Sequence, residues 1–388
     1  MRVALVQNIT VYDHRMVHID NVARELTSRG HHVDVIINNS SQSIIMTSCP
    51  YKIISLPGET YSIFGQIRFV YNLYKLLRKE KYEIIHSKNP FSSVFPALLN
   101  KAHSKVIYDI RGLWIDFAVH AGYIPKQLKK ILNHIDIFCM KKVHAVIAIS
   151  QEMKKILAER GVDDSKIMVI VGAGVNTGTR SDVKDVKDYL DISGRIIGYV
   201  GTISRTRSSD QIIQAFSILR KQSHFDTHLV LVGPFSEGEE KYFRKLTNSM
   251  QLKNYISFTG FLPHELVLQL LTSFDVVIAY HEHDLPIYNV AVPTKILEYL
   301  AAGCAIVTTD QKMYQNVLTN NKDAILTAQN PQAFANGILS VLNNPEISRK
   351  LKTNALQTAQ KYSIESIVDS IEYMYEKLLS LRVSPEFS

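Results

Sequence analysis

Short apolar runs alternate along the chain with longer segments in which apolar residues recur every three or four positions. The short runs have the length and β-branched content of buried strands, and the longer segments have the period of amphipathic helices. The first pair is the run at residues 2–7 and the segment at 16–29, which stops at Gly30, a common helix-ending residue. This alternation predicts a parallel sheet with helices on both of its faces.

The alternation continues to residue 160. A loop containing Gly112 and Trp114 is expected after the strand that ends at Asp109. The remaining strands are expected at 33–37, 52–56, 84–86, 105–109 and 145–150, and the helices at 64–79, 127–142 and 151–160.

Residues 172–194 break this pattern, because they are rich in Gly, Asp, Thr and Ser and carry no strong period. They are interpreted as an interdomain linker with one short helix. A second series follows, with strands expected at 195–200, 228–232, 256–259, 276–279 and 305–308, helices at 210–221, 239–250, 264–273 and 294–302, and a helical tail from 332.

These two series predict an α/β protein with two Rossmann-like domains that face a cleft. We expect an N-terminal domain at 1–175, a C-terminal domain at 176–365, and a C-terminal helix and tail at 366–388 that cross back to the N-terminal domain. Ligands of such sheets bind at the carboxyl ends of the strands.

The composition fits two soluble domains. The chain has 388 residues, of which 46% are hydrophobic and 21% charged, and no apolar run approaches the roughly 18 residues of a membrane span. Because a strand begins at Val3, no secretory signal is expected. The three cysteines (Cys49, Cys139 and Cys304) lie far apart and are odd in number, which argues against a disulfide framework and favours a reducing cytoplasm.

The net charge of +8 is unevenly placed, since residues 1–150 hold 19 basic against 10 acidic side chains. Basic residues also stripe two expected amphipathic helices of this half, at 64–79 and 127–142. An anionic membrane surface fits this pattern, and an ordinary solvated surface is the alternative. No nucleic-acid-binding motif is present, so nucleic acid is not an expected partner.

The segment 293–307 carries the clearest chemical signal. A helix that starts near Pro293 leaves the N–H groups of Thr294 and Lys295 free, and a helix N-terminus favours an anion such as a diphosphate. Lys295 adds a full positive charge. Glu298 is the sole acid of a helix with buried character, so its carboxylate needs hydrogen bonds, which two ribose hydroxyls would supply. A structural ion pair is the alternative.

A second motif lies at 198–208. The expected strand ends at Gly201, where the backbone can approach a ligand closely because there is no side chain. Arg205 and Arg207 follow on the loop, and a guanidinium can bind phosphate oxygens with two hydrogen bonds. Two exposed loop arginines are the alternative interpretation.

Together these segments resemble the retaining glycosyltransferases of family 4, which have the GT-B fold. Residues 293–307 are similar to that family's pattern Ser-Pro-x-Lys-x-x-Glu-Tyr-x-Ala-x-Gly-x-Pro-Val, and the resemblance extends over nearly the whole chain. It implies that Glu298 binds the donor ribose and that Arg207 belongs to a diphosphate clamp. It also implies that Phe261 and Leu262 border the nucleotide base, although a plain strand-to-helix turn is an equal alternative.

One position departs from the pattern. Many members have a second glutamate, which contacts the transferred sugar, where this chain has Val290. His281, Glu282 and Asp284 are candidate replacements, and solvated loop side chains are the alternative. The residue that holds the sugar therefore stays open.

The N-terminal half supplies further candidates by the same resemblance. The segment 108–116 looks like the family's Asp-x-His/Arg segment, which implies that Asp109 and Arg111 lie at the transferred sugar. An arginine cannot serve as a base at neutral pH, but it can orient a hydroxyl or stabilise phosphate. Arg15 is a candidate for the acceptor or phosphate side, and so is His86, although a single histidine is more often structural.

We therefore expect a hexosyltransferase-type enzyme that transfers a sugar with retention from a nucleotide-diphosphate sugar to a glycan or lipid-linked acceptor, in surface polysaccharide or glycolipid synthesis. Fixed positive groups would stabilise the leaving diphosphate without a metal, and no cofactor is expected. The expected location is the cytoplasm, with a peripheral site on the inner face of the cell membrane left open. Two alternatives remain, a sugar-nucleotide 2-epimerase of the same fold and a non-catalytic nucleotide-sugar-binding subunit.

Overall fold

A computed structural model of the chain describes residues 1–10, 16–39, 49–59, 62–100, 103–120, 124–172, 174–177, 185–281 and 290–380. The chain divides into two compact units. The N-terminal unit consists of Met1–Gly174 together with Ile364–Ser388, and the C-terminal unit consists of Val175–Ser363. The chain passes between the units within two residues of the boundaries expected from the sequence.

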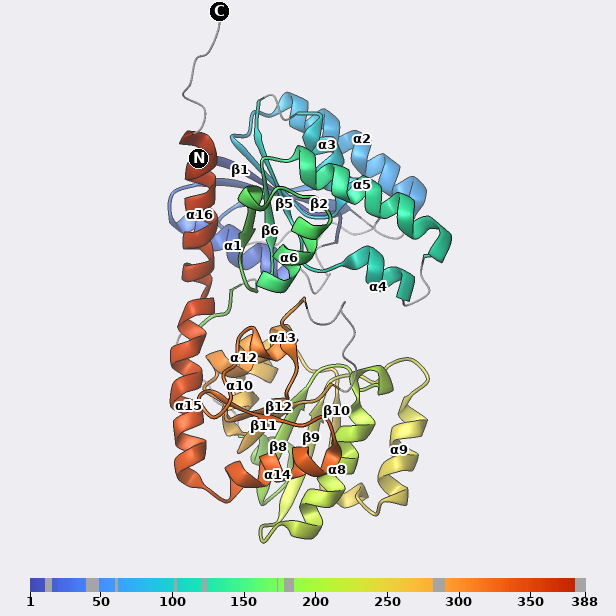
Figure 1. The fold of residues 1–388 in the computed structure, drawn as a ribbon, viewed down its shortest axis with the longest axis vertical. Helices are drawn as coiled ribbons and strands as arrows, with labels where there is room; N and C mark the ends of the chain where they lie inside the picture. The colour runs from blue at the N-terminus through green and yellow to red at the C-terminus, as the bar shows by residue number, and fades with distance from the viewer. Residues whose placement is uncertain are drawn as a thin grey trace, which may run out of the picture. The chain divides into compact units, whose positions relative to one another are not determined.

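The N-terminal unit is built on a seven-stranded parallel sheet with the order β3-β2-β1-β4-β5-β6-β7 (Figure 1). The chain runs from β1 outward to β3 and then returns to place β4 on the other side of β1. This reversal is a topological switch point, where ligands of open α/β sheets bind. The strands are β1 (Arg2–Val6), β2 (His32–Asn39), β3 (Lys52–Pro57), β4 (Ile84–Ser87), β5 (Lys105–Asp109), β6 (Ala145–Ala148) and β7 (Ile167–Val169).

Helices connect these strands, and local sequence fixes several of their ends. The side chain of Ser62 caps α2 by accepting from the Gly65 N–H, and Ser150 caps α6 in the same way. Gly30 ends α1 with a φ of 85°, a conformation that suits glycine. The helices are α1 (Met16–Ser28), α2 (Ile63–Lys79), α3 (Phe95–Leu98), α4 (Trp114–His120), α5 (Lys129–Lys142) and α6 (Gln151–Glu159), with a short π-helix at Pro90–Val94.

Several short elements of this unit differ from the sequence prediction. The loop expected around Trp114 is the helix α4, and α3, the π-helix and β7 were not predicted. They have seven, four, five and three residues, so each is shorter than the window over which a period can be recognised.

The C-terminal unit contains a six-stranded parallel sheet with the order β10-β9-β8-β11-β12-β13, whose switch point lies between β8 and β11. The strand β13 was not predicted from the sequence. The strands are β8 (Arg195–Val200), β9 (Thr227–Val232), β10 (Ile256–Gly260), β11 (Val276–Ala279), β12 (Ile306–Thr309) and β13 (Ala324–Thr327).

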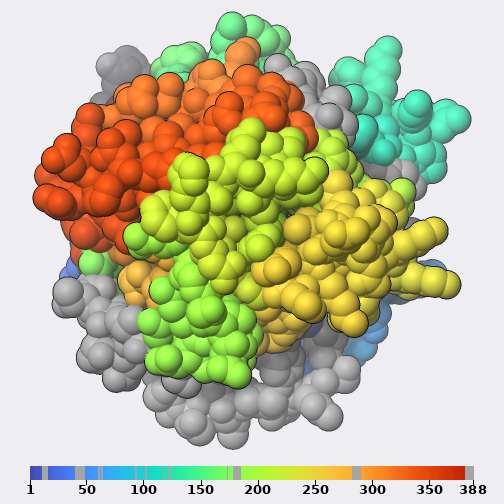
Figure 2. Space-filling model, turned by 90° about the horizontal axis from the view of Figure 1, so that it is seen from below, coloured from blue at the N-terminus to red at the C-terminus, as the bar shows by residue number. Residues whose placement is uncertain are grey.

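Helices cover this second sheet on both faces (Figure 1). On one outer face, α8 lies between α9 and the orange-red segment of α14 and α15 (Figure 2), and α8 packs against α14. The helices are α7 (Val186–Leu190), α8 (Ser209–Gln222), α9 (Glu240–Ser249), α10 (His264–Leu270), α12 (Thr294–Ala301), α13 (Lys312–Gln315), α14 (Pro331–Leu342) and α15 (Pro345–Ala359).

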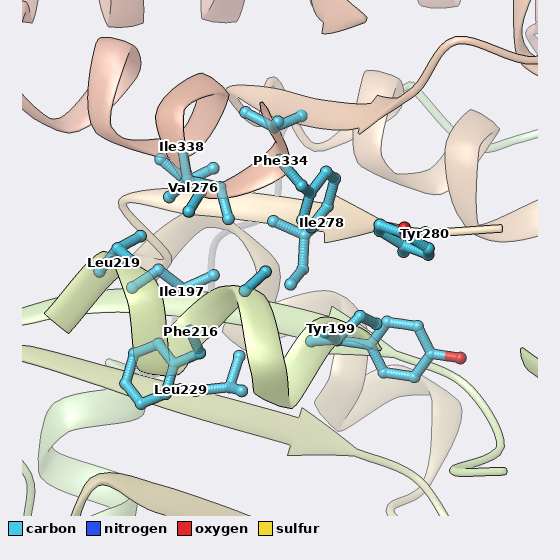
Figure 3. Packing of buried hydrophobic residues seen from close by; sticks show 14 of the residues in the cluster. Ile197, Tyr199, Phe216, Leu219, Leu229, Val276, Ile278, Tyr280, Phe334 and Ile338 are labelled. Carbon is cyan, nitrogen blue, oxygen red and sulfur yellow. The ribbon is translucent and has the colours of Figure 1, made fainter. Parts of the chain in front are cut away.

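The core of the C-terminal unit lies between the sheet and α8 and α14. Ile197, Ile278 and Phe334 are buried in one apolar cluster (Figure 3), because strands covered on both faces need apolar side chains on both sides. Tyr199 and Tyr280 lie at the carboxyl-terminal end of this cluster, where the strands run toward the candidate site (Figure 3).

The last helix, α16 (Ile364–Ser380), belongs to the N-terminal unit, as the sequence predicted. It packs on α1 through a buried face that includes Ile367 and Ile371. Arg29 at the end of α1 forms ion pairs with Asp369 and Glu372, at 2.6 and 2.9 Å. None of the helices in the described ranges is long and apolar enough to cross a bilayer.

Candidate active site

The strongest candidate site of the C-terminal unit lies at its switch point, at the carboxyl ends of β8 and β11. Gly201 follows β8, and the helix α12 follows β11 in the sheet's second half. Tyr299 connects α12 to the end of β8, because its hydroxyl oxygen accepts a hydrogen bond of 2.9 Å from the N–H of Val200. The N-terminal turn of α12 is therefore held beside the end of β8.

The first turn of α12 has the open N–H groups that the sequence predicted. The helix starts at Thr294 with Pro293 as its N-cap residue, and no side chain caps it. Within the described part of the chain, the N–H groups of Thr294 and Lys295 donate no hydrogen bond. These donors and the positive end of the helix dipole favour an anion.

Lys295 brings a positive charge to this turn. Its ammonium lies 4.0 Å from the centre of the Tyr199 ring, and a Cβ at Gly201 would come within 2.7 Å of it. Burial and, to a smaller extent, the positive charge of Arg207 lower the pKa of Lys295 to about 7, against the opposite effect of Glu298. An anionic ligand here would favour the charged form of the lysine.

Glu298 lies one turn further along α12 and has a partner already. Its Oε1 accepts a hydrogen bond of 2.7 Å from Nε2 of His264, at the start of α10. The Glu298 side chain is 15% exposed and that of His264 is 49% exposed. The structural pairing considered as the alternative is thus present, as a hydrogen bond between Glu298 and a local histidine.

The two arginines of the 198–208 motif behave differently. Arg205 forms an ion pair of 2.8 Å with Glu239, whose carboxylate also accepts from the Arg205 N–H. The exposed Arg207 has no ion pair with any of the described residues, and its charge acts on Lys295. Arg207 is therefore the better candidate for a phosphate contact.

The sequence predicts Phe261 and Leu262 at the nucleotide base, and Val290 and His281 are the positions considered for the transferred sugar. Phe261 is 77% exposed and follows β10, with Leu262 beside it and His264 two residues further on. Val290 is fully buried and offers no polar group. His281 is buried too, and its Nδ1 lies 2.8 Å from the hydroxyl of Tyr314. Its contacts are those of a packed residue.

In the N-terminal unit, Asp109 forms the centre of a buried polar cluster at the end of β5. Its Oδ2 lies 2.7 Å from Nη2 of Arg111, 3.2 Å from Nε2 of His86 and 3.7 Å from Nζ of Lys88. Burial alone would raise the pKa of Asp109, but Arg111, Lys88 and His86 together hold it far below its usual range. Asp109 is therefore a carboxylate at every ordinary pH.

This cluster brings together three residues that the sequence singled out, Asp109, Arg111 and His86. Arg111 also donates to the carbonyl oxygen of Gly172, which fixes the direction of its guanidinium. Sequence reasoning missed Lys88 and Tyr375 as members. The position of Lys88 directly after the strand that ends at Ser87 could have indicated it, whereas nothing in the sequence links Tyr375 to His86.

Three candidates cannot be placed, because Arg15, Glu282 and Asp284 lie outside the described residues. Among the residues that are described, no group of three or more histidine, cysteine, aspartate or glutamate side chains is arranged to hold a metal ion.

The architecture defines the class of the protein as an α/β protein of two Rossmann-like units, each with a polar cluster at its switch point. Two family models match the chain in adjoining segments. The model described as "Glycosyltransferase Family 4" matches residues 17–177, and that described as "Glycosyl transferases group 1" matches residues 185–358.

Named relatives align over most of the chain. A D-inositol 3-phosphate glycosyltransferase of Corynebacterium urealyticum is 23% identical over 93% of this chain and 90% of its own length. An N,N'-diacetylbacillosaminyl-diphospho-undecaprenol alpha-1,3-N-acetylgalactosaminyltransferase of Campylobacter jejuni is 21% identical over 95% of this chain and 96% of its own.

Solved structures show the same fold. HepE of Anabaena, crystallised in complex with UDP, superposes with a TM-score of 0.76 at 16% identity, covering 97% of this chain and all of HepE. WaaG, a glycosyltransferase of lipopolysaccharide biosynthesis, superposes with a TM-score of 0.69 at 13% identity, covering 97% of this chain and 99% of WaaG. The chain is a glycosyltransferase with the GT-B fold and is similar to family 4, which confirms the fold and the enzyme class predicted from the sequence.

Proposed function

We propose that this enzyme transfers a hexose-type sugar from a nucleotide-diphosphate sugar to a glycan or lipid-linked acceptor in surface polysaccharide or glycolipid synthesis. One observation carries the donor half of the proposal. The open first turn of α12, the ammonium of Lys295 and the carboxylate of Glu298 lie on one helix at the switch point of the C-terminal unit. The first two suit a diphosphate and the third suits a ribose.

In this proposal each residue of the donor site has one role. The N–H groups of Thr294 and Lys295, together with the Lys295 ammonium, bind the diphosphate, and Arg207 adds a second positive charge. Gly201 lets the phosphates approach the backbone, since a side chain there would meet Lys295. Glu298 exchanges its hydrogen bond with His264 for bonds to the ribose, and Phe261 and Leu262 border the base.

Chemistry at the sugar is assigned to the N-terminal unit. Negative charge grows on the diphosphate as the glycosidic bond breaks, so fixed positive groups stabilise the transition state more than the ground state. Lys295, Arg207 and the α12 N-terminus are such groups, which supports transfer without a metal or cofactor. Asp109 and Arg111 are proposed to orient the reacting hydroxyl, and retention of configuration is proposed on the family resemblance.

Exposed apolar side chains on two helices of the N-terminal unit support a lipid-linked acceptor. On α2, Phe64, Ile67 and Tyr71 share one face and are 85%, 61% and 56% exposed. On α5, Ile131 and Phe138 are 59% and 50% exposed. We call these five side chains the apolar stripe.

Basic side chains flank the apolar stripe. The ammonium of Lys75 lies 4.3 Å from the centre of the Tyr71 ring, and that of Lys142 lies 5.7 Å from the centre of the Phe138 ring. Aromatic and apolar side chains beside lysines suit the interface of an anionic bilayer. We therefore propose a cytoplasmic enzyme that is peripherally bound at the inner face of the cell membrane.

An acceptor-dependent turnover assay tests the proposal. The protein is incubated with UDP-, GDP-, ADP- and TDP-sugars, with and without a membrane lipid extract, and free nucleoside diphosphate is followed together with the donor sugar. We expect nucleotide release that requires the extract, and a product whose anomeric configuration matches that of the donor.

Three other outcomes would each contradict one part of the proposal. Epimerised donor in the absence of acceptor identifies a sugar-nucleotide 2-epimerase. Donor binding without turnover under any condition identifies a non-catalytic binding subunit. Turnover that stops with EDTA and returns with a divalent ion contradicts metal-independent transfer.

A further inference from the structure

The buried cluster around Asp109 is connected to the last helix of the chain. A small pocket at the carboxyl ends of the central strands of the N-terminal unit is lined by His86, Asp109 and Arg111, and Ile371 of α16 closes one side of it. Tyr375, a second residue of α16, contacts the cluster directly. The hydroxyl of Tyr375 lies 2.7 Å from Nδ1 of His86, and both side chains are buried.

The charges of the cluster determine which atoms carry the protons. Asp109 is ionised and can only accept, so the ring nitrogen of His86 that faces it, Nε2 at 3.2 Å, must carry a hydrogen. Burial lowers the pKa of His86 despite the nearby carboxylate of Asp109, so the imidazole is neutral. A neutral ring with a hydrogen on Nε2 has an unprotonated Nδ1, and the hydroxyl of Tyr375 must then be the donor.

Tyr375 is suited to this role, because burial raises the pKa of its hydroxyl well above the ordinary value and the group keeps its proton. The two rings meet edge to face with centroids 6.0 Å apart, which also fixes the orientation of the imidazole. The hydrogen bond therefore runs from Tyr375 to His86, and the Nε2–H of His86 faces the Asp109 carboxylate at 3.2 Å.

We propose that Tyr375 is a positioning residue for the transfer reaction, which sets the tautomer of His86 and through it the orientation of the Asp109 carboxylate. The proposal rests on the proposed function, in which Asp109 and Arg111 orient the reacting hydroxyl. It goes beyond that function because it makes the C-terminal helix part of the acceptor-side machinery as well as a packing element.

The bonding of Asp109 explains why its orientation matters. Oδ2 takes the bonds from Arg111 and the contact with His86, whereas Oδ1 is buried and has no hydrogen-bond partner among the described residues. A carboxylate held through one oxygen presents the other one in a fixed direction. Without the imidazole held in place, the carboxylate can rotate about the arginine and Oδ1 loses that direction.

The test removes only the hydroxyl of Tyr375. Tyr375→Phe keeps the ring and its packing, and Tyr373→Phe is the matched control on the same helix, because Tyr373 is 59% exposed. The tautomer of His86 is measured by nitrogen NMR of the histidine rings, with His86→Gln used to assign the signals. The kcat and KM for donor and acceptor are measured on the same proteins.

We expect wild-type His86 to be the neutral tautomer with its hydrogen on Nε2. In Tyr375→Phe we expect a mixture of tautomers and a kcat lower by about tenfold with the donor KM unchanged, since one hydrogen bond is lost. Tyr373→Phe should match the wild type in both measurements. A residue with a purely structural role would lower thermal stability without changing the tautomer.

A wild-type His86 with its hydrogen on Nδ1, or an unchanged tautomer and kcat in Tyr375→Phe, would overturn the proposal. The wild-type spectrum needs only His86→Gln for its assignment, so it decides the bonding even if Tyr375→Phe does not fold. It also needs no turnover. Failure of the proposed function, seen as absence of transfer by the wild-type enzyme, is therefore distinguishable from failure of this inference.

Discussion

The ammonium group of Lys295 occupies the space that a side chain at position 201 would need. A Cβ on Gly201 would lie 2.7 Å from Nζ of Lys295, and Gly201 has a φ of 141°, which L-residues rarely adopt. The glycine after β8 and the lysine of α12, 94 residues apart in the sequence, therefore form one structural unit at the switch point.

Gly201→Ala is expected to weaken binding of the nucleotide-diphosphate sugar by tenfold or more, because it displaces the Lys295 ammonium from the proposed diphosphate site. Titration calorimetry measures the affinity. Gly30→Ala is the control for backbone strain, since Gly30 also has a positive φ, of 85°, but a Cβ there would meet nothing within 4 Å. Equal affinity of the Gly201 variant and the wild type would contradict the proposed site.

Donor affinity should fall as the pH rises above 7. In the free protein the pKa of Lys295 is about 7, and a bound diphosphate raises it, so binding takes up a proton at higher pH. Affinity should fall by up to about tenfold per pH unit above 7. The diphosphate of a sugar nucleotide does not titrate in this range, and Lys295→Arg, which stays charged, should abolish the dependence.

The same shift makes the stability of the ligand-free protein depend on pH. The unfolded lysine, with a pKa of 10.5, binds a proton that the native side chain lacks between about pH 7 and 10.5. The contribution of Lys295 to the free energy of unfolding therefore rises with pH across this window. Comparison of wild type and Lys295→Met by chemical denaturation at several pH values checks the sign.

Glu298→Ala is expected to lower donor affinity by roughly tenfold to hundredfold, the loss typical of a hydrogen bond to a charged group. Titration calorimetry with the donor identified in the turnover assay measures it. Glu265→Gln, at an exposed acid of α10 next to His264, controls for the change of charge. Unchanged affinity in Glu298→Ala would remove the ribose assignment.

Binding to vesicles should depend on the apolar stripe and on anionic lipid. The double variant Phe64→Glu and Phe138→Glu is expected to lose co-sedimentation with vesicles that contain phosphatidylglycerol, and the wild type should not bind phosphatidylcholine alone. Leu356→Glu, at a 46% exposed leucine of the C-terminal unit, is the control. Equal sedimentation of the double variant and the control would argue against a membrane role for α2 and α5.

Asp136 on α5 should destabilise the protein at neutral pH. It is 6% exposed, and burial raises its pKa to about 6 despite the hydrogen bond from Tyr108. The protonated side chain favours the native state. This contribution to the free energy of unfolding is fully present below about pH 4 and is lost as the pH rises through 6. Asp136→Asn should therefore raise the free energy of unfolding by ~2 kcal/mol at pH 8, and by little near pH 4. A stabilisation independent of pH would contradict this prediction.

The amino-acid sequence alone determined the fold class, the two Rossmann-like units and the motif that we propose as the donor site. Buried parallel strands and amphipathic helices leave strong periodic signals over many residues, and the segment around Lys295 and Glu298 is contiguous. Such local information is sufficient because a helix start, a lysine and an acid one turn apart lie on the same helix whatever surrounds them.

Tertiary structure alone decided which polar groups meet. It paired Glu298 with His264, assigned Arg205 to Glu239 and brought Tyr375 to His86, across separations of 34, 34 and 289 residues. It also left the apolar sides of α2 and α5 exposed, although helical periodicity by itself is typical of an apolar face that packs on a core. These outcomes depend on how elements pack, and packing joins residues whose separation in the chain carries no periodic signal.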